Sequence, residues 1–286
     1  MSKIVIDTNL INFKSINIES FFTDNTMYVT DNLIFETIKS SKDDSISADF
    51  KKFIPYKENI YFLDGIGEVI KKEIENLIPL TDIKEIAYPN NVYPLNCLFD
   101  IAIKEGINSE CLVEDFKDIL SKAQKYKEDM ARELPKYYAE LESFNLLNIF
   151  IRDGFGEDFA KSLKNSIRKY LKEILNDRYF KIGKELNINI ENFLLKCSFL
   201  CRTILTSIAI CLYYKKNGGI LPKTEKLKNT IIDSSFFVYA SYADILLTND
   251  KLEKEIFNNY FIHLINLVSP AQIQSKACNR DELTSF

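Results

Sequence analysis

The sequence predicts a three-layer α/β/α fold with a mainly parallel central sheet and a large all-helical insertion. Short, unbroken apolar runs occur near both ends of the chain, as is typical of strands that a parallel sheet buries on both faces. Between residues 66 and 217, apolar residues recur at helical spacing and strand signals nearly vanish. Gly and Pro are scarce, at 8 and 7 of 286 residues, which favours long helices over an all-β fold.

Residues 1–65 are expected to form the first part of the sheet domain. Strands are predicted at 3–6, 27–29 and 59–63, each a short apolar or β-branched run. A helix is predicted at 32–40, because Asp31 is a good N-cap in front of it. The chain therefore begins with the alternation of strands and helices that builds a parallel sheet.

Residues 66–217 are expected to form the helical insertion, and residues 218–286 to complete the sheet domain. In the insertion, helices are predicted at 66–78, 94–105, 113–150, 157–182 and 190–216. In the last part, helices are predicted at 230–242 and 251–258, and strands at 245–247 and 263–268. The expected architecture is one sheet domain, discontinuous in sequence, that carries a helical insertion.

Composition points to a cytoplasmic protein with reduced thiols. The N-terminus lacks the apolar segment of a signal peptide. In the most apolar stretch, 193–214, the longest uncharged run, 203–214, has 12 residues where a membrane helix needs about 20. The cysteines are irregularly spaced in a chain too long to need a disulfide framework. They are Cys97, Cys111, Cys197, Cys201, Cys211 and Cys278. The net charge of −4 means that binding a polyanion would depend on a local basic surface.

Four acidic residues are the candidate catalytic and metal-binding site. Asp7 and Asp250 directly follow predicted strands, whereas Glu36 and Asp233 lie on predicted helices. The carboxyl ends of parallel strands meet at one edge of a sheet, where ligands bind in open α/β folds. Two carboxylates about 4 Å apart repel by about 4 kcal/mol at an effective dielectric constant of 20, so a cluster of four favours a bound cation. Carboxylate oxygens are the ligands that Mg²⁺ or Mn²⁺ prefers.

These residues lie in motifs that resemble those of the PIN-domain nucleases. VIDTN resembles the first-strand motif around Asp7, and NLIFETIKS resembles the second motif around Glu36. DSSFFVYASYADILLTND, from Asp233 to Asp250, resembles the third and fourth motifs, and LINLVSPAQI resembles the last strand and turn. The resemblance covers about 1–65 and 218–286, so the helical middle departs from it. It implies a PIN-like fold and a metal-dependent endonuclease that hydrolyses phosphodiester bonds, with single-stranded RNA as the expected substrate.

Neighbouring polar residues are expected to support the site by hydrogen bonds. These are Asn9, Thr248 and Asn249. Asp244 is interpreted as a turn residue before a strand, and His263, the only histidine, as a structural residue within a strand. With one histidine, a histidine-rich zinc site is excluded and a Ser-His-Asp triad is disfavoured. No glycine-rich phosphate-binding loop is present.

A basic stripe in the insertion is the candidate nucleic-acid contact. Lys161, Lys164, Arg168 and Lys172 follow spacings of 3, 4 and 4, which place them on one face of a helix. The alternative interpretation is an ordinary solvated face. Three readings of the function stay open at this point: an RNA endonuclease, a DNA-directed or structure-specific nuclease, and a catalytically silent scaffold that binds RNA or protein. A homodimer or an inhibitory protein partner is compatible with each of them.

Overall fold

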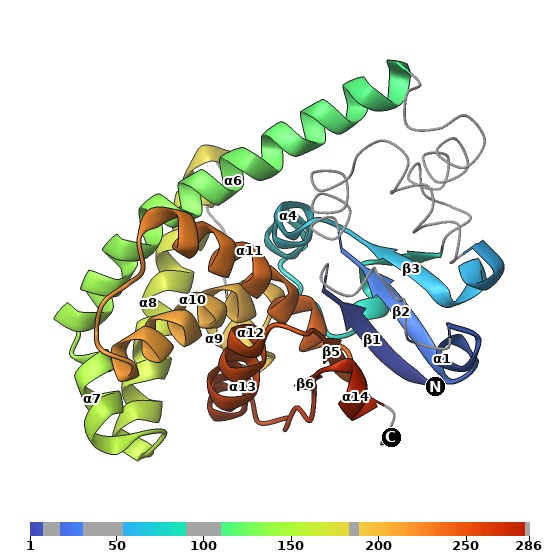
Figure 1. Cartoon of the computed structure of the whole chain (residues 1–286). Coiled ribbons are helices and arrows are strands. Elements are labelled where there is room, and N and C mark those ends of the chain that lie inside the picture. Colours follow the sequence, from blue (N-terminus) through green and yellow to red (C-terminus); the bar gives the residue numbers. More distant parts are fainter. Residues whose placement is uncertain (8–17, 31–53, 90–109, 183–188, 284–286) are drawn as a thin grey trace.

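A computed structural model describes residues 1–7, 18–30, 54–89, 110–182 and 189–283. It shows an α/β fold built on a six-stranded sheet of order β4-β3-β2-β1-β5-β6 (Figure 1). The strands are β1 (Ser2–Ile6), β2 (Asn25–Val29), β3 (Ile60–Leu63), β4 (Ala87–Pro89), β5 (Ile245–Leu247) and β6 (Lys276–Cys278). All neighbouring pairs are parallel except β3 and β4, so the mainly parallel sheet is confirmed.

The middle strand β1 is paired on both sides, as its apolar sequence predicts. Ile4 lies in register with Met27 of β2 and with Ile245 of β5. Ile4, Val5 and Ile6 are all completely buried, because layers of helix cover both faces of a parallel sheet. Helix α11 packs on β1 and β5, and α1 packs on β2, an arrangement consistent with three α/β/α layers.

Helices make up most of the rest of the described chain. Near the sheet they are α1 (Ile18–Asp24), α4 (Ile66–Asn76), α11 (Thr224–Ala240), α12 (Lys251–Ile256), α13 (Ile262–Val268) and α14 (Arg280–Leu283). In the central part they are α6 (Glu110–Ser143), α7 (Leu146–Asp153), α8 (Glu157–Ile182), α9 (Ile190–Leu195) and α10 (Phe199–Lys216). Short 3₁₀ helices cover Ile54–Asn59 and Ile83–Glu85. No helix in the described ranges is long and apolar enough to cross a membrane.

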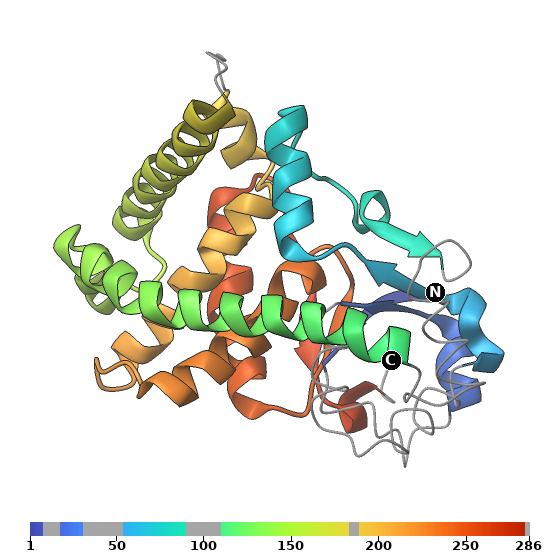
Figure 2. The ribbon, with the colours of Figure 1, turned by 90° about the horizontal axis from the view of Figure 1, so that it is seen from above.

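The central helices lie beside the sheet and not over it. In both views α7 and α8 occupy the side of the molecule away from the strands, and α6 extends from there toward the side of the sheet (Figures 1 and 2). Helix α10 packs against α4, α6, α7, α8, α9 and α11, so it joins the two regions. Strand β4, which lies inside the predicted insertion of 66–217, pairs with β3 of the sheet.

Two long predicted helices are each divided by a residue with positive φ. The predicted helix at 113–150 becomes α6 and α7, because the chain turns at Asn145 with φ 60°. The predicted helix at 190–216 becomes α9 and α10, where Cys197 has φ 45° and the Ser198 side chain caps α10 by accepting from Cys201 N–H. Helix α8 begins and ends where it was predicted.

The prediction of a strand at 263–268 is wrong. These residues lie in α13, which continues from α12 through a π-helical turn at Phe257–Phe261. Phe261, Leu264, Ile265 and Val268 are buried at spacings of 3, 1 and 3, which is one face of a helix. The last strand is β6, outside the predicted range. The helix predicted at 230–242 begins earlier, at Thr224, and the helices predicted at 32–40 and 94–105 lie outside the described residues.

A buried carboxylate fixes α4 against the start of α10. Glu73 is 3% exposed, and its Oε1 accepts hydrogen bonds from Leu80 N at 2.6 Å and Phe199 N at 2.7 Å. Its Oε2 accepts from Leu200 N at 2.8 Å. Burial raises the pKa of the Glu73 carboxyl, while these N–H donors and nearby Arg202 oppose the rise. The carboxylate thus satisfies N–H groups that the first turn of a helix leaves unpaired.

Replacing Glu73 by Gln should therefore destabilise the protein. A side-chain amide offers one accepting oxygen, so it leaves at least one buried N–H without a partner and sets its own N–H groups against backbone N–H. We expect the free energy of unfolding to fall by about 1–3 kcal/mol, measured by urea denaturation. Glu75→Gln, an exposed change on the same helix, is the control and should shift it by less than about 0.5 kcal/mol. Equal effects of the two variants would contradict this role.

Candidate functional site

The carboxyl edge of the parallel sheet carries a row of buried polar residues. Asp7 follows β1, Thr30 follows β2, Asp64 follows β3 and Thr248 follows β5. All four are less than 9% exposed, and Asp7 and Thr248 are completely buried. The backbone ladder continues to this edge, because Asp7 N–H donates to the Leu247 carbonyl at 3.0 Å. The strand register therefore sets Asp7 beside Thr248, as predicted for strand ends that are distant in sequence.

The Thr248 hydroxyl connects two carboxyl groups. Its Oγ1 lies 3.0 Å from Asp7 Oδ2 and 2.7 Å from Glu253 Oε2. It also accepts a hydrogen bond from Asp250 N–H at 3.0 Å. Thr248, predicted as a supporting residue, is thus in contact with the predicted site residue Asp7. Glu253, in α12, is a member of the group that the sequence analysis missed.

A hydroxyl has one hydrogen, so it cannot donate to both carboxyl groups at once. If Thr248 donates to Asp7, the short contact to Glu253 requires a proton on Glu253, which then donates to Thr248. The pKa of Glu253 is raised well above its usual value, first by burial and then by the charges of Asp7, Asp233 and Asp250, while the hydrogen bond with Thr248 opposes the rise. A neutral Glu253 at the centre of three acidic residues satisfies both the hydrogen-bond geometry and the electrostatics.

Asp233 and Asp250 approach Glu253 from two different helices. Asp233 is half-buried in the interior of α11, nine residues after that helix begins at Thr224. Asp250 is the N-cap of α12, and its Oδ1 accepts from Leu252 N at 2.6 Å and Glu253 N at 3.1 Å. Asp250 Oδ2 makes no hydrogen bond within the described part of the chain. Capping therefore uses one oxygen of Asp250 and leaves the other for a ligand.

A sequence signal for Glu253 exists, but it predicts a different contact. Asp250 and Glu253 have the spacing of a capping box, in which the second side chain would accept from the N-cap backbone N–H. In the structure Asp250 N–H donates to Thr248, and Glu253 turns toward the sheet edge. Glu253 is 3% exposed, and its buried Oε1 has no hydrogen-bond partner among the described residues. An orphaned oxygen among carboxylates is a place where a cation fits.

The ligand set predicted from the sequence is described only in part. Glu36 and Asn9 lie outside the described residues. Within the described ranges, no three His, Cys, Asp or Glu side chains are close enough together to form a ready metal site. Asn249 is exposed at the same edge. Within these ranges Thr248 is in direct contact with the carboxyl groups of Asp7 and Glu253, and the charges of Asp233 and Asp250 act on Glu253.

Two other polar residues were interpreted as structural. Asp244 is in the predicted turn before β5, where its carboxylate accepts from Lys3 N at 2.7 Å and its own N–H donates to the Lys3 carbonyl at 2.9 Å. His263 lies on helix α13 and not on a strand. Its ring is exposed and stacks on Phe155, with the centroids 5.0 Å apart.

The predicted basic stripe lies on the outer face of α8. Lys161 and Lys172 are exposed, and Lys164 is half-buried. Arg168 is already engaged, because its Nε and Nη2 donate to the two oxygens of Glu191 at 2.7 and 3.1 Å. Helix α8 lies on the side of the molecule away from the sheet (Figure 1). The stripe is therefore distant from the carboxylate edge, and one of its four charges is neutralised.

No protein-family model, no curated protein and no solved structure matches this chain in the three comparisons with known proteins. The resemblance to PIN-domain nucleases therefore depends on the short motifs and on the placement of their residues in the fold.

The structure predicts how Glu253→Gln changes stability in the absence of divalent cations. Because the folded-state pKa of Glu253 lies above its unfolded value, the folded protein binds more protons in the interval between them, and stability falls as pH rises through it. Gln can donate to Thr248 as the protonated acid does, without ionising. At pH 8 we expect the free energy of unfolding of the variant to exceed that of wild type by at least about 1 kcal/mol, since one unit of pKa elevation corresponds to about 1.4 kcal/mol. Near pH 4 we expect little difference between the two proteins.

Urea denaturation in EDTA at the two pH values measures this difference. Glu255→Gln, an exposed change on α12, is the matched control and should show no pH-dependent gain. A Glu253→Gln variant that is destabilised equally at both pH values would show that Glu253 is ionised in the folded protein.

Proposed function

We propose that this protein is a divalent-metal-dependent endonuclease that hydrolyses phosphodiester bonds, with single-stranded RNA as its substrate. The observation that carries the proposal is the pair of buried acids, Asp7 and Glu253, which share the Thr248 hydroxyl at the carboxyl edge of the sheet. Two more acidic residues, Asp233 and Asp250, act electrostatically on the same point. A cluster of this kind is costly to bury unless a cation or a proton neutralises it.

In this proposal Asp7, Glu36, Asp233 and Asp250 hold Mg²⁺ or Mn²⁺, and Glu253 completes the acidic site. A divalent ion bound there would supply an activated water and stabilise the charge on the leaving oxygen. Thr248 orients Asp7 through its hydroxyl, and the N-cap geometry of Asp250 holds one carboxylate oxygen in place while the other is available. Glu253 would be protonated without a cation and would lose this proton if a cation were bound beside it.

The PIN-like identity of the fold is part of the same proposal. Its support is the position of three motif residues. Asp7 stands at the end of β1, and Asp250 stands three residues beyond the end of β5, the strand next to it. Asp233 lies on α11, which packs on both of these strands. Two motif residues thus follow neighbouring strands, and the third lies on a helix that covers those strands.

The alternative of a silent scaffold predicts carboxylates engaged by basic side chains. Asp250 and Glu253 form no ion pair with Lys or Arg in the described part of the chain, which favours a site kept for an external cation. A metal-dependent site of this kind would hydrolyse RNA and DNA by the same chemistry at phosphorus. Substrate class is therefore the first quantity to measure.

Asp7→Asn and Asp250→Asn should each lower the cleavage rate by about 100-fold or more, because each change removes a ligand charge that stabilises the transition state by several kcal/mol. The fold should persist, and the melting temperature in EDTA should stay the same or rise as repulsion is relieved. Asp24→Asn, an exposed change at the end of α1, is the matched control and should keep wild-type activity. Wild-type rates in both site variants would exclude this carboxylate site.

Cleavage should require a divalent cation and should prefer single-stranded RNA. We expect EDTA to abolish activity and excess Mg²⁺ or Mn²⁺ to restore it, because the proposed site has no side-chain nucleophile. Matched RNA and DNA oligomers of one sequence, single- and double-stranded, measure the preference. Faster cleavage of DNA would assign the protein to the DNA-directed class, and full activity in excess chelator would overturn the metal-dependent mechanism.

A further inference from the structure

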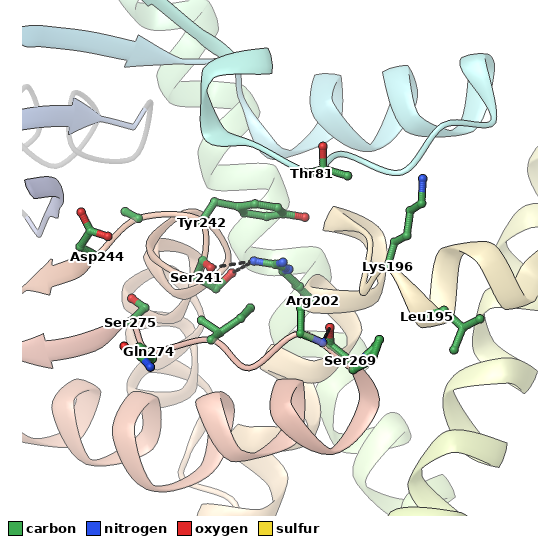
Figure 3. Close-up of a pocket in the computed structure, with 14 residues that line it drawn as sticks. Thr81, Leu195, Lys196, Arg202, Ser241, Tyr242, Asp244, Ser269, Gln274 and Ser275 are labelled. Carbon is green, nitrogen blue, oxygen red and sulfur yellow. Dashed lines mark hydrogen bonds between the residues drawn. The ribbon is translucent and has the colours of Figure 1, made fainter.

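A pocket of about 680 Å³ opens at the amino-terminal edge of the sheet, opposite the carboxylate edge (Figure 3). It lies beside Asp244 and Ser275, which directly precede β5 and β6. Its other walls come from the turn after α11, from residues 195 and 196 before α10, and from the segment 269–274. A volume of this size is in the range of small-molecule sites.

The buried side chain of Arg202 forms part of the pocket wall. Arg202 comes from α10 and is only 6% exposed. Its Nε donates to the Cys197 carbonyl at 2.8 Å, and its Nη1 donates to the Ser241 carbonyl at 2.8 Å and to Ser241 Oγ at 2.9 Å. The guanidinium carbon lies 3.5 Å from the centroid of the Tyr242 ring. These contacts hold the guanidinium plane in one orientation (Figure 3).

Arg202 forms no salt bridge with a carboxylate in the described ranges. Its three hydrogen bonds go to neutral oxygens, and no carboxylate of those ranges lies within 4 Å of its nitrogens. The remaining nitrogen, Nη2, makes no hydrogen bond to the described chain. Glu73 is near enough for its charge to interact with Arg202, but its oxygens are occupied by three backbone N–H groups. A buried cation without an ion pair is costly, and an anion in the pocket would complete it.

The rest of the lining suits an anionic group on a partly apolar body. Lys196 is exposed at the pocket and adds a second positive charge. Asp244 also lines the pocket, but its carboxylate already accepts from Lys3 N–H. Leu195, Ala271 and Ile273 supply apolar surface. The two N–H groups of Nη2 are left to donate to the oxygens of a carboxylate or phosphate, because Nε and Nη1 already donate to Cys197 and Ser241.

We propose that this pocket is a binding site for a small organic anion, whose carboxylate or phosphate group contacts Arg202 and whose apolar part packs against Leu195 and Ile273. The site is on the edge of the sheet opposite the acidic cluster, so it is independent of the proposed nuclease activity. Phosphate and carboxylate groups are both anions that accept hydrogen bonds from a guanidinium. Ligands that carry either group on the same apolar ring can show which of the two is preferred.

Isothermal titration calorimetry of the full chain tests the proposal with phenyl phosphate, benzoate and neutral benzyl alcohol. The buffer contains EDTA, so that a cation at the acidic cluster cannot recruit phosphate. We expect at least one of the two anions to bind with a Kd of about 1 mM or tighter, and benzyl alcohol to bind at least about tenfold more weakly. The tighter of the two anions identifies the preferred headgroup.

A matched pair of substitutions locates the binding site. Gln274 lines the pocket and Gln272 does not, and both are exposed. Gln274→Glu should weaken anion binding by about tenfold through the added negative charge, whereas Gln272→Glu should change it by less than about twofold. Arg202→Lys, checked for an unchanged fold by circular dichroism, should weaken binding further because it loses the Nη2 donors. Lack of binding by both anions, or equal effects of the two Gln→Glu changes, would overturn the proposal.

Discussion

The parallel pairing of β1 with β5 is the interaction on which the rest of this molecule depends. It joins residues about 240 positions apart, and Ile4, Val5 and Ile6 are completely buried in the resulting sheet. The same register fixes both edges. At the amino edge it brings Lys3 to Asp244, and at the carboxyl edge it brings Asp7 to Thr248. A shift of one residue would turn the core-facing side chains to the opposite face and separate these pairs.

Helix α10 connects the helices near the sheet with those of the central part, because it packs against both groups. It is buried almost all round, and its first turn is held by Glu73 from α4 and by the Ser198 cap. The six residues from Cys197 to Arg202 contain the change of helix direction at Cys197 and the cap at Ser198. They also contain the cation Arg202, which donates to Ser241 at the end of α11. Helix α11 also carries Asp233. Helix α11 therefore connects the two edges of the sheet. Arg202 contacts its C-terminal end, and Asp233 lies along its length.

Hydrophobic pattern predicts the parts of this fold in which local sequence and burial agree. The strands β1, β2, β3 and β5 and the helix α8 appear where they were expected, because each is a continuous run with one period. Strand β6 is only three residues long and is defined by pairing with β5, a long-range contact that no local pattern shows. The apolar run after Tyr260 was misread because β-branched composition outweighed the spacing of Phe261, Leu264, Ile265 and Val268. Breaks at Asn145 and Cys197 were missed because neither position is Gly or Pro.

The acidic site was predictable only as far as strand ends could be located. Asp7 and Asp250 follow apolar strands, so the edge of the sheet was the natural place for both. Glu253 was missed because its role depends on which way its side chain turns, and the alternative of a capping box has the same spacing. Asp233 lies further inside its helix than expected, because α11 begins at Thr224 and not at residue 230.

The chain order of the carboxylate edge has a consequence for synthesis. Asp7 is synthesised before Thr248, Asp250 and Glu253, which follow it in the chain by more than 240 residues. A nascent chain therefore holds Asp7 without the partners that β5 brings to it, and β1 lacks one of its two neighbouring strands. Contacts of such long sequence separation form late in folding. The acidic cluster therefore cannot assemble while the ribosome is still translating the helical middle of the chain.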